Sequence, residues 1–194
     1  SKAQFLDHFE RNKHDRDTAL REAIGWWRSL PKAPWQEDIM LNQTAPALRD
    51  ALMPDAIADM DYEGFRTICY GVHAIKDYSR RVANKAVNLL EDGTAYTSPE
   101  KVDALSKRIW NDRSSGGHDV RQLLDFILNR GPEGLLPERL WAAVHDPKWK
   151  IDGLGVSALG ELVGWAKPDK FPPRNGRTSK SLKSLGYDVT VHVG

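Results

Sequence analysis

The sequence predicts an all-α fold, because the start and stop signals of helices recur along the chain. Asp15 and Asp17 are favoured N-cap residues in front of an apolar-periodic stretch, and Pro31 stops that stretch. Residues 118–130 repeat their apolar side chains at the spacing of one helix face, and Gly131 follows as a C-terminal glycine. These signals together indicate a helical bundle.

The other predicted elements follow from the same signals. The predicted helices span residues 15–30, 44–53, 61–90, 98–112, 118–130, 137–145, 156–166 and 178–185. The longest of them is expected to bend at Gly71. The helix at 98–112 has Ser98 as its N-cap and Pro99 at its first position. Residues 187–191 alternate like a short strand.

Length and composition predict one compact domain. The chain has 194 residues, enough to bury a real core, and the connection 114–117 divides it into regions 1–115 and 116–194. The formal net charge is only +1, which argues against a wholly nonspecific, histone-like DNA binder. A single cysteine, Cys69, and the lack of a transmembrane run predict a cytoplasmic protein with no membrane partner.

Several kinds of chemistry lack their residue patterns here. The six histidines are scattered, with no Cys or His pair at metal-ligand spacing, so no metal site is expected. Asp55, Asp59 and Asp61 cluster without the Glu-x-Lys of a two-metal nuclease, and we interpret them as helix caps. No Gly-x-x-x-x-Gly-Lys-Ser/Thr motif occurs, which excludes nucleotide hydrolysis by that route.

The most informative segment is 151–159, Ile-Asp-Gly-Leu-Gly-Val-Ser-Ala-Leu, between two predicted helices. Gly-apolar-Gly before a helix is typical of the turn of a helix-hairpin-helix. Gly153 and Gly155 let the backbone approach a nucleic-acid strand, and the amides at the start of the next helix can bind an anion. The same pattern also forms plain tight turns between helices, so both interpretations stay open on the motif alone.

A basic stretch follows the hairpin. Its cations are Lys167, Lys170, Arg174, Arg177, Lys180 and Lys183. Asp169 is the only acidic residue within this stretch. Such clustering is typical of a phosphate-binding surface, although solvated lysine-rich faces are also common. Before the turn, Trp149 lies between Lys148 and Lys150, where an aromatic ring can press on a sugar or stack on an unpaired base.

Taken together, residues 137–188 resemble the helix-hairpin-helix region of the DNA glycosylase superfamily. In that family a Leu-Pro-Gly-apolar-Gly hairpin precedes a helix, and an apolar-Asp segment then opens another helix. Here residues 170–177, Lys-Phe-Pro-Pro-Arg-Asn-Gly-Arg, occupy the position of that apolar-Asp segment. The match covers roughly a quarter of the chain. It implies a DNA-glycosylase-like, all-α fold with a DNA-facing cleft beside the hairpin.

Two departures from the family bear on catalysis. The position of the family's catalytic Asp matches Asn175, which cannot ionise or act as a general base. The position of the Lys nucleophile of bifunctional members matches Ser157. We therefore expect no catalytic residue in this chain.

The Phe-Pro-Pro-x-Asn-Gly-Arg stretch also resembles that of N-terminal specificity domains in McrB-like, modification-dependent restriction proteins. That resemblance implies a reader of modified duplex DNA in restriction and antiphage defence. It also implies an AAA+ motor domain as a partner in the full-length protein.

The sequence thus predicts a non-catalytic module that binds double-stranded DNA. The predicted DNA-binding residues are Gly153, Gly155, Val156, Lys148, Trp149, Lys150, Lys170, Arg174, Asn175, Arg177 and Lys180. No cofactor is expected, apart from a monovalent cation that can bridge the hairpin and a phosphate. Two alternatives stay open: an active glycosylase whose acid is Asp152, Asp169 or Asp188, and a protein-interaction module.

Overall fold

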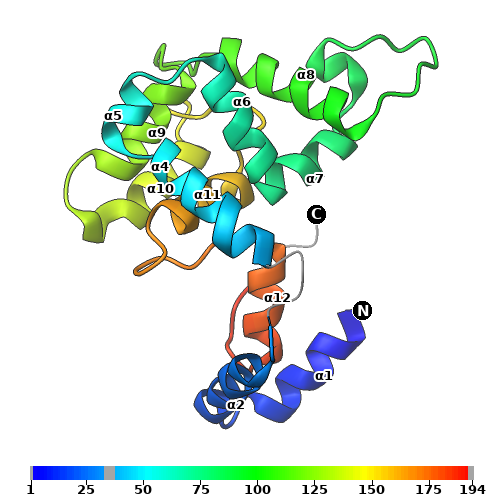
Figure 1. Cartoon of the computed structure of the whole chain (residues 1–194), viewed down its shortest axis with the longest axis vertical. Coiled ribbons are helices and arrows are strands. Elements are labelled where there is room, and N and C mark those ends of the chain that lie inside the picture. Colours follow the sequence, from blue (N-terminus) through cyan, green and yellow to red (C-terminus); the bar gives the residue numbers. More distant parts are fainter. Residues whose placement is uncertain (1, 33–37, 192–194) are drawn as a thin grey trace.

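The computed structural model describes residues 2–32 and 38–191, and within these ranges the only regular secondary structure is helical (Figure 1). The α-helices are α1 (Lys2–Asn12), α2 (Arg16–Ser29), α4 (Ala45–Ala51), α5 (Pro54–Ala58), α6 (Tyr62–Gly71), α7 (His73–Arg81), α8 (Ser98–Asn111), α9 (Val120–Asn129), α10 (Leu136–His145), α11 (Val156–Ala166) and α12 (Gly176–Ser184). A π-helical turn, η1 (Met40–Thr44), and two 3-10 turns, η2 (Asn84–Val87) and η3 (Glu133–Leu135), also occur. The all-α prediction is confirmed, and residues 187–191 form no strand.

Helices α4 to α11 form a body around one hydrophobic core, and α1, α2 and α12 form an arm that extends from it (Figure 1). In the arm, α1 packs against α12, and the side-chain amide of Asn12 donates to the carbonyl of Ser184 at 2.8 Å. The backbone at Gly186 has φ +92, and a Cβ there would lie 2.5 Å from the carbonyl carbon of Asn12. The N-terminal and C-terminal segments of the chain therefore meet in the arm.

Helix starts follow capping chemistry, with one shift from the prediction. Asp15 caps α2, accepting from the Thr18 amide at 3.4 Å, as its sequence position suggests. The predicted cap of α8, Ser98, is wrong by one residue. Thr97 is the cap, because Glu100 reaches back to the Thr97 amide and completes a capping box. Sequence analysis predicts neither α1 nor α5.

Residues 61–90 do not form one helix, which corrects the prediction. The expected bend is a full break, because Val72 is extended, with ψ 116, and buried. The amides of His73 and Ala74, which start α7, donate to the Glu161 carboxylate on α11 at 2.8 and 2.9 Å. A side chain distant in sequence thus caps a helix start that local signals do not mark. After α7 the chain turns through η2 instead of continuing as a helix.

Helix α11 lies in the core, and residues 158–164 are all buried. It packs against α4, α7, α9 and α10. Its glycine face, formed by Gly160 and Gly164, lies against the returning chain. A Cβ on Gly164 would be 2.2 Å from the Cα of Pro173, and one on Gly160 would be 3.0 Å from the carbonyl oxygen of Arg174. A side chain at Gly164 therefore requires the backbone to move.

We expect Gly164→Ala to lower the free energy of unfolding by roughly 2 kcal/mol or more, because contact with backbone cannot be relieved by a rotamer change. Gly25→Ala on α2 is the matched control, since nothing lies within 4 Å of its Cβ position, and it should stabilise slightly. Urea unfolding followed by circular dichroism measures both variants. Wild-type stability of Gly164→Ala would contradict the close approach.

A polar cluster joins α6 to α8. Arg66 donates to both carboxylate oxygens of Asp103, at 2.6 and 3.0 Å, and the Tyr70 hydroxyl donates to Asp103 at 2.8 Å. These hydrogen bonds, that of Arg66 first, hold the pKa of Asp103 below its ordinary value. Because folding lowers this pKa, the stability contributed by the carboxylate is present above its unfolded pKa of about 4. That contribution is lost as the pH falls through the folded pKa.

We expect Asp103→Asn to lower the free energy of unfolding at neutral pH by roughly 0.5–1 kcal/mol, a modest value because the pair is partly exposed. The difference from wild type should shrink as the pH falls below about 4. Unfolding titrations across this pH range measure it, with exposed Asp50→Asn as the control. A difference that is constant with pH would show that Asp103 acts through packing alone.

Candidate nucleic-acid interface

The connection between α10 and α11 is a compact hairpin, residues 146–155. The Asp146 carbonyl accepts from the amides of Trp149 and Lys150, both at 2.9 Å, and the Asp146 carboxylate accepts from the Lys148 amide at 2.9 Å. The turn closes where the Leu154 amide donates to the Ile151 carbonyl at 3.2 Å. Ile151 and Leu154 are buried, which fastens the turn to the core.

The two glycines of the hairpin have different roles. Gly153 has φ +91, and a Cβ there would lie 3.2 Å from Ile109 on α8, so this glycine faces the body. Gly155 has φ −85, a conformation open to any residue, and nothing lies within 4 Å of its Cβ position. The expectation that both glycines leave room for a nucleic-acid strand therefore fits Gly155, whereas Gly153 is required by the turn itself.

The start of α11 is an uncapped helix N-terminus at the surface. Gly155 is the N-cap residue, and no side-chain hydrogen bond caps this helix in the described part of the chain. The amides of Val156 and Ser157 are among the first-turn donors that a helix cannot satisfy internally. Lys148 and Lys150 in the same hairpin are exposed. Uncapped amides and the positive end of a helix dipole together favour a nearby anion.

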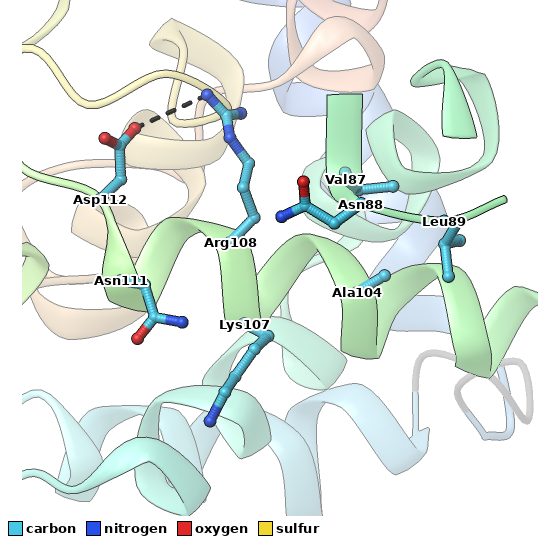
Figure 2. A pocket seen from close by; sticks show the side chains of 8 residues that line it. All are labelled: Val87, Asn88, Leu89, Ala104, Lys107, Arg108, Asn111 and Asp112. Carbon is cyan, nitrogen blue, oxygen red and sulfur yellow. Dashed lines mark ion pairs between the residues drawn. The ribbon is translucent and has the colours of Figure 1, made fainter. Parts of the chain in front are cut away.

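Arg108 on α8 supports the turn from outside the motif. Its guanidinium donates to the Asp152 carbonyl at 3.3 Å and lies 3.6 Å from a carboxylate oxygen of each of Asp152 and Asp112. Figure 2 shows the Arg108 side chain extended toward Asp112, beside a pocket of about 480 Å³ between α8 and residues 87–89. Sequence reasoning misses Arg108, because 44 positions separate it from Asp152.

The 114–117 segment, predicted as a connection between regions, is tied to the hairpin. The Ser114 hydroxyl donates to the Lys148 carbonyl at 2.6 Å, and the Ser115 amide donates to the Pro147 carbonyl at 3.0 Å. The first arm of the hairpin is therefore held by two hydrogen bonds from this segment.

Trp149 is part of a stack of three rings. Its ring lies 3.8 Å from that of Phe126 and 4.0 Å from that of His118, with interplanar angles of 4° and 10°. Two rings so close and so nearly parallel to the indole must lie on its opposite faces. A DNA base can therefore stack on Trp149 only by displacing one of them, and the remaining contact open to DNA is the ring edge.

The structure divides the predicted basic residues into paired and unpaired ones. Lys170 is ion-paired with Glu133 at 2.6 Å, so part of its charge is neutralised within the protein. In the described part of the chain, Arg174, Arg177 and Lys180 have no carboxylate within ion-pair distance. The predicted face is therefore less basic than the sequence suggests.

Helix α11 separates the predicted site residues into two groups. The hairpin lies at its N-terminus, whereas Lys170 follows its C-terminus, and an 11-residue helix is about 16 Å long. The chain then doubles back along α11, and the Arg174 amide donates to the Gly160 carbonyl at 3.2 Å. This return brings Arg174 to within about 6 Å, measured along the helix axis, of Val156.

Asn175 has a structural partner. Its side-chain oxygen accepts from the amides of Arg177 and Thr178, at 2.9 and 3.1 Å, and so caps α12. Asn175 and Arg177 also line a cavity of about 820 Å³, whose walls include Tyr70, Lys76 and Trp165 from the body. Because the side-chain oxygen is used in this cap, the predicted hydrogen bond of Asn175 to sugar or base must come from its side-chain nitrogen.

The carboxylates considered for a glycosylase lie apart from this cavity. Asp152 pairs with Arg108 and Asp188 with Lys183, while Asp169 is exposed. The carboxylate that lines the cavity is the buried Glu161, which sequence reasoning misses. Since both of its oxygens already accept backbone amides at the start of α7, Glu161 serves as a helix cap.

Comparisons of the chain with protein-family models, curated proteins and solved structures find no match. Among the described residues, no group of three or more His, Cys, Asp or Glu side chains can hold a metal ion. Within the same ranges, no helix combines the length and apolarity needed to cross a bilayer.

We expect Gly153→Ala to destabilise the fold by about 1–2 kcal/mol, because alanine resists the left-handed conformation and Ile109 limits the space. Gly155→Ser should leave stability unchanged or slightly higher, since serine can cap α11. Thermal unfolding of both variants tests the two roles. Equal losses of stability in the two variants would contradict the distinction between the glycines.

Proposed function

We propose that the chain is a DNA-recognition module that binds duplex DNA through a helix-hairpin-helix. The observation that carries the proposal is the uncapped N-terminus of α11, open at Gly155 and flanked by the exposed Lys148 and Lys150. In this account the Gly155 and Val156 amides bind one phosphate of the DNA backbone. Gly153 shapes the turn that presents them.

Electrostatics extend this contact along the DNA backbone. Arg174 returns alongside α11 toward the hairpin, and Arg177 and Lys180 continue from it on the first turns of α12. Each cation that neutralises a phosphate releases a counterion, so binding should weaken steeply as salt rises. A protein-interaction surface built on the same hairpin would lack that dependence on DNA charge.

The same residues support recognition rather than base excision. By the resemblance, Asn175 matches the position of the family's catalytic carboxylate, and Ser157 offers no amine nucleophile. In the structure Asn175 caps α12. We infer that the module reads modified duplex DNA for a restriction or defence protein, in which a motor domain acts on the bound DNA. This narrower inference rests on the resemblance of residues 171–177, Phe-Pro-Pro-Arg-Asn-Gly-Arg, to the N-terminal specificity domains of McrB-like restriction proteins.

Substitutions at Gly155 test the hairpin while sparing the fold. We expect Gly155→Asp to weaken duplex binding by about tenfold or more, because its carboxylate repels the phosphate that the amides bind. Gly155→Ala is the matched control, because alanine fits this position and cannot cap the helix, and it should keep affinity within a fewfold of wild type. Fluorescence anisotropy with a labelled duplex at two salt concentrations measures both. A folded Gly155→Asp variant with wild-type affinity would overturn the proposal.

The same titration distinguishes the kinds of recognition. Duplexes that carry methylated cytosine or methylated adenine are compared with an unmodified duplex of the same sequence. A gain in affinity for one of them supports modification reading and identifies the mark. Salt-sensitive binding that ignores the mark would reduce the proposal to a general DNA-binding module. No binding at low salt would favour protein interaction.

A further inference from the structure

Helix α2 is an amphipathic helix whose apolar face is exposed at Ile24 and Trp27 and only partly buried at Leu20. None of its 14 residues is buried, and no other helix packs along it. Figure 1 shows α2 at the end of the arm, away from the body formed by α4 to α11. Helices of this length are marginal in isolation and depend on packing of their apolar face. The face therefore lacks the contacts that normally stabilise such a helix.

The uncovered face is a continuous apolar patch. At about 100° per residue, Leu20, Ile24 and Trp27 lie within about 60° of one another around the helix. Ile24 is 41% exposed, Trp27 40% and Trp26, at the side of the patch, 63%. The two indoles meet edge to face, with ring centroids 6.5 Å apart. Adjacent exposed aromatic residues are typical of interaction surfaces, whereas scattered ones are not.

The first turn of α2 is held in place, which leaves the patch presented outward. The Arg16 guanidinium lies 5.2 Å from the centre of the Tyr187 ring, and the Tyr187 hydroxyl donates to Asp17 at 3.1 Å. Asp15 caps the same end. A second molecule therefore meets a helix whose N-terminal end is already anchored to the chain.

We propose that this patch binds the same patch of a second copy of the chain, with the two α2 helices antiparallel about a two-fold axis. With the axis between residues 23 and 24, Leu20 faces Trp27 of the second copy, and Ile24 faces Ala23. Trp26 lies about 100° or more around the helix from each of Leu20, Ile24 and Trp27, so it remains outside this contact.

Charge supports a second copy over another partner. Asp17 and Arg28 lie on the same side of α2, about 60–80° from Leu20 around the helix axis. In the antiparallel register, Arg28 lies within one helical turn of Asp17 of the second copy, and symmetry produces this pair twice. The self-association therefore joins apolar residues at the centre and opposite charges at the side of one surface.

The size of the patch sets the strength of the association. The contact residues Leu20, Ile24 and Trp27, of which Ile24 and Trp27 are 40–41% exposed, supply far less than the roughly 800 Å² per partner of a standard interface. The dimer should therefore dissociate in the micromolar range, and it requires no DNA.

Sedimentation equilibrium over a range of about 1–300 µM tests the dimer, because weak interfaces dissociate within it. Wild type should pass from monomer to dimer, and Ile24→Asp should remain monomeric with unchanged circular dichroism. Leu90→Asp, at a 67% exposed position after η2, is the charge-matched control and should behave as wild type. A wild type that stays monomeric, or a dimer that survives Ile24→Asp, would overturn the proposal.

Cysteine cross-linking tests the register. Ile24 lies beside the two-fold axis, so Ile24→Cys should form an intermolecular disulfide with oxidised glutathione. Glu22→Cys, on the opposite side of α2, should not. The native Cys69 is fully buried and does not compete. Equal cross-linking of the two variants would show that the helices do not pair by this face.

Discussion

The close approach of the returning chain to the glycine face of α11 is the constraint on which the rest of the arrangement depends. Pro173 and Arg174 lie against Gly164 and Gly160 at distances that leave no room for side chains. This contact turns the chain back along α11, sets the start of α12 at Asn175, and brings Arg174 from the far end of the helix toward the hairpin. The residues that we propose to face DNA thus come from segments on either side of a buried helix.

Burial of α11 also makes its N-terminus a rigid site. Residues 158–164 lie in the core, and the Glu161 carboxylate fixes α11 to the start of α7. On the surface side, Arg108 and Ser114 hold the two arms of the hairpin. An anion that binds at Gly155 therefore meets amides already in place, so little ordering is required at the moment of binding.

Features encoded by neighbouring residues could be predicted from the sequence. The bounds of α11, 156–166, and the Asp15 cap match the structure, because caps, glycines and apolar spacing act within one or two turns. The break in 61–90 could not be predicted, since it depends on Glu161, which is distant in sequence. The turn at Gly153 also carried a local signal, because its φ of +91 favours glycine.

The candidate site was predicted less completely for the same reason. Charge alone did not reveal that Glu133 pairs with Lys170, or that His118 and Phe126 enclose the indole of Trp149. No sequence pattern around Arg108 indicates its contact with Asp152. Each of these contacts joins residues that only the tertiary fold brings together, and each changes which groups are free to meet a phosphate.

The central claim is that the first amides of α11 bind the DNA backbone, and amide chemical shifts observe those groups directly. Protein labelled with nitrogen-15 would be titrated with a short duplex at low salt while each backbone amide is followed. The largest changes should fall on Gly155, Val156 and Ser157, with smaller ones at Lys148 and Lys150, and added salt should reverse them. Unchanged shifts at the start of α11, with or without changes elsewhere, would contradict the account.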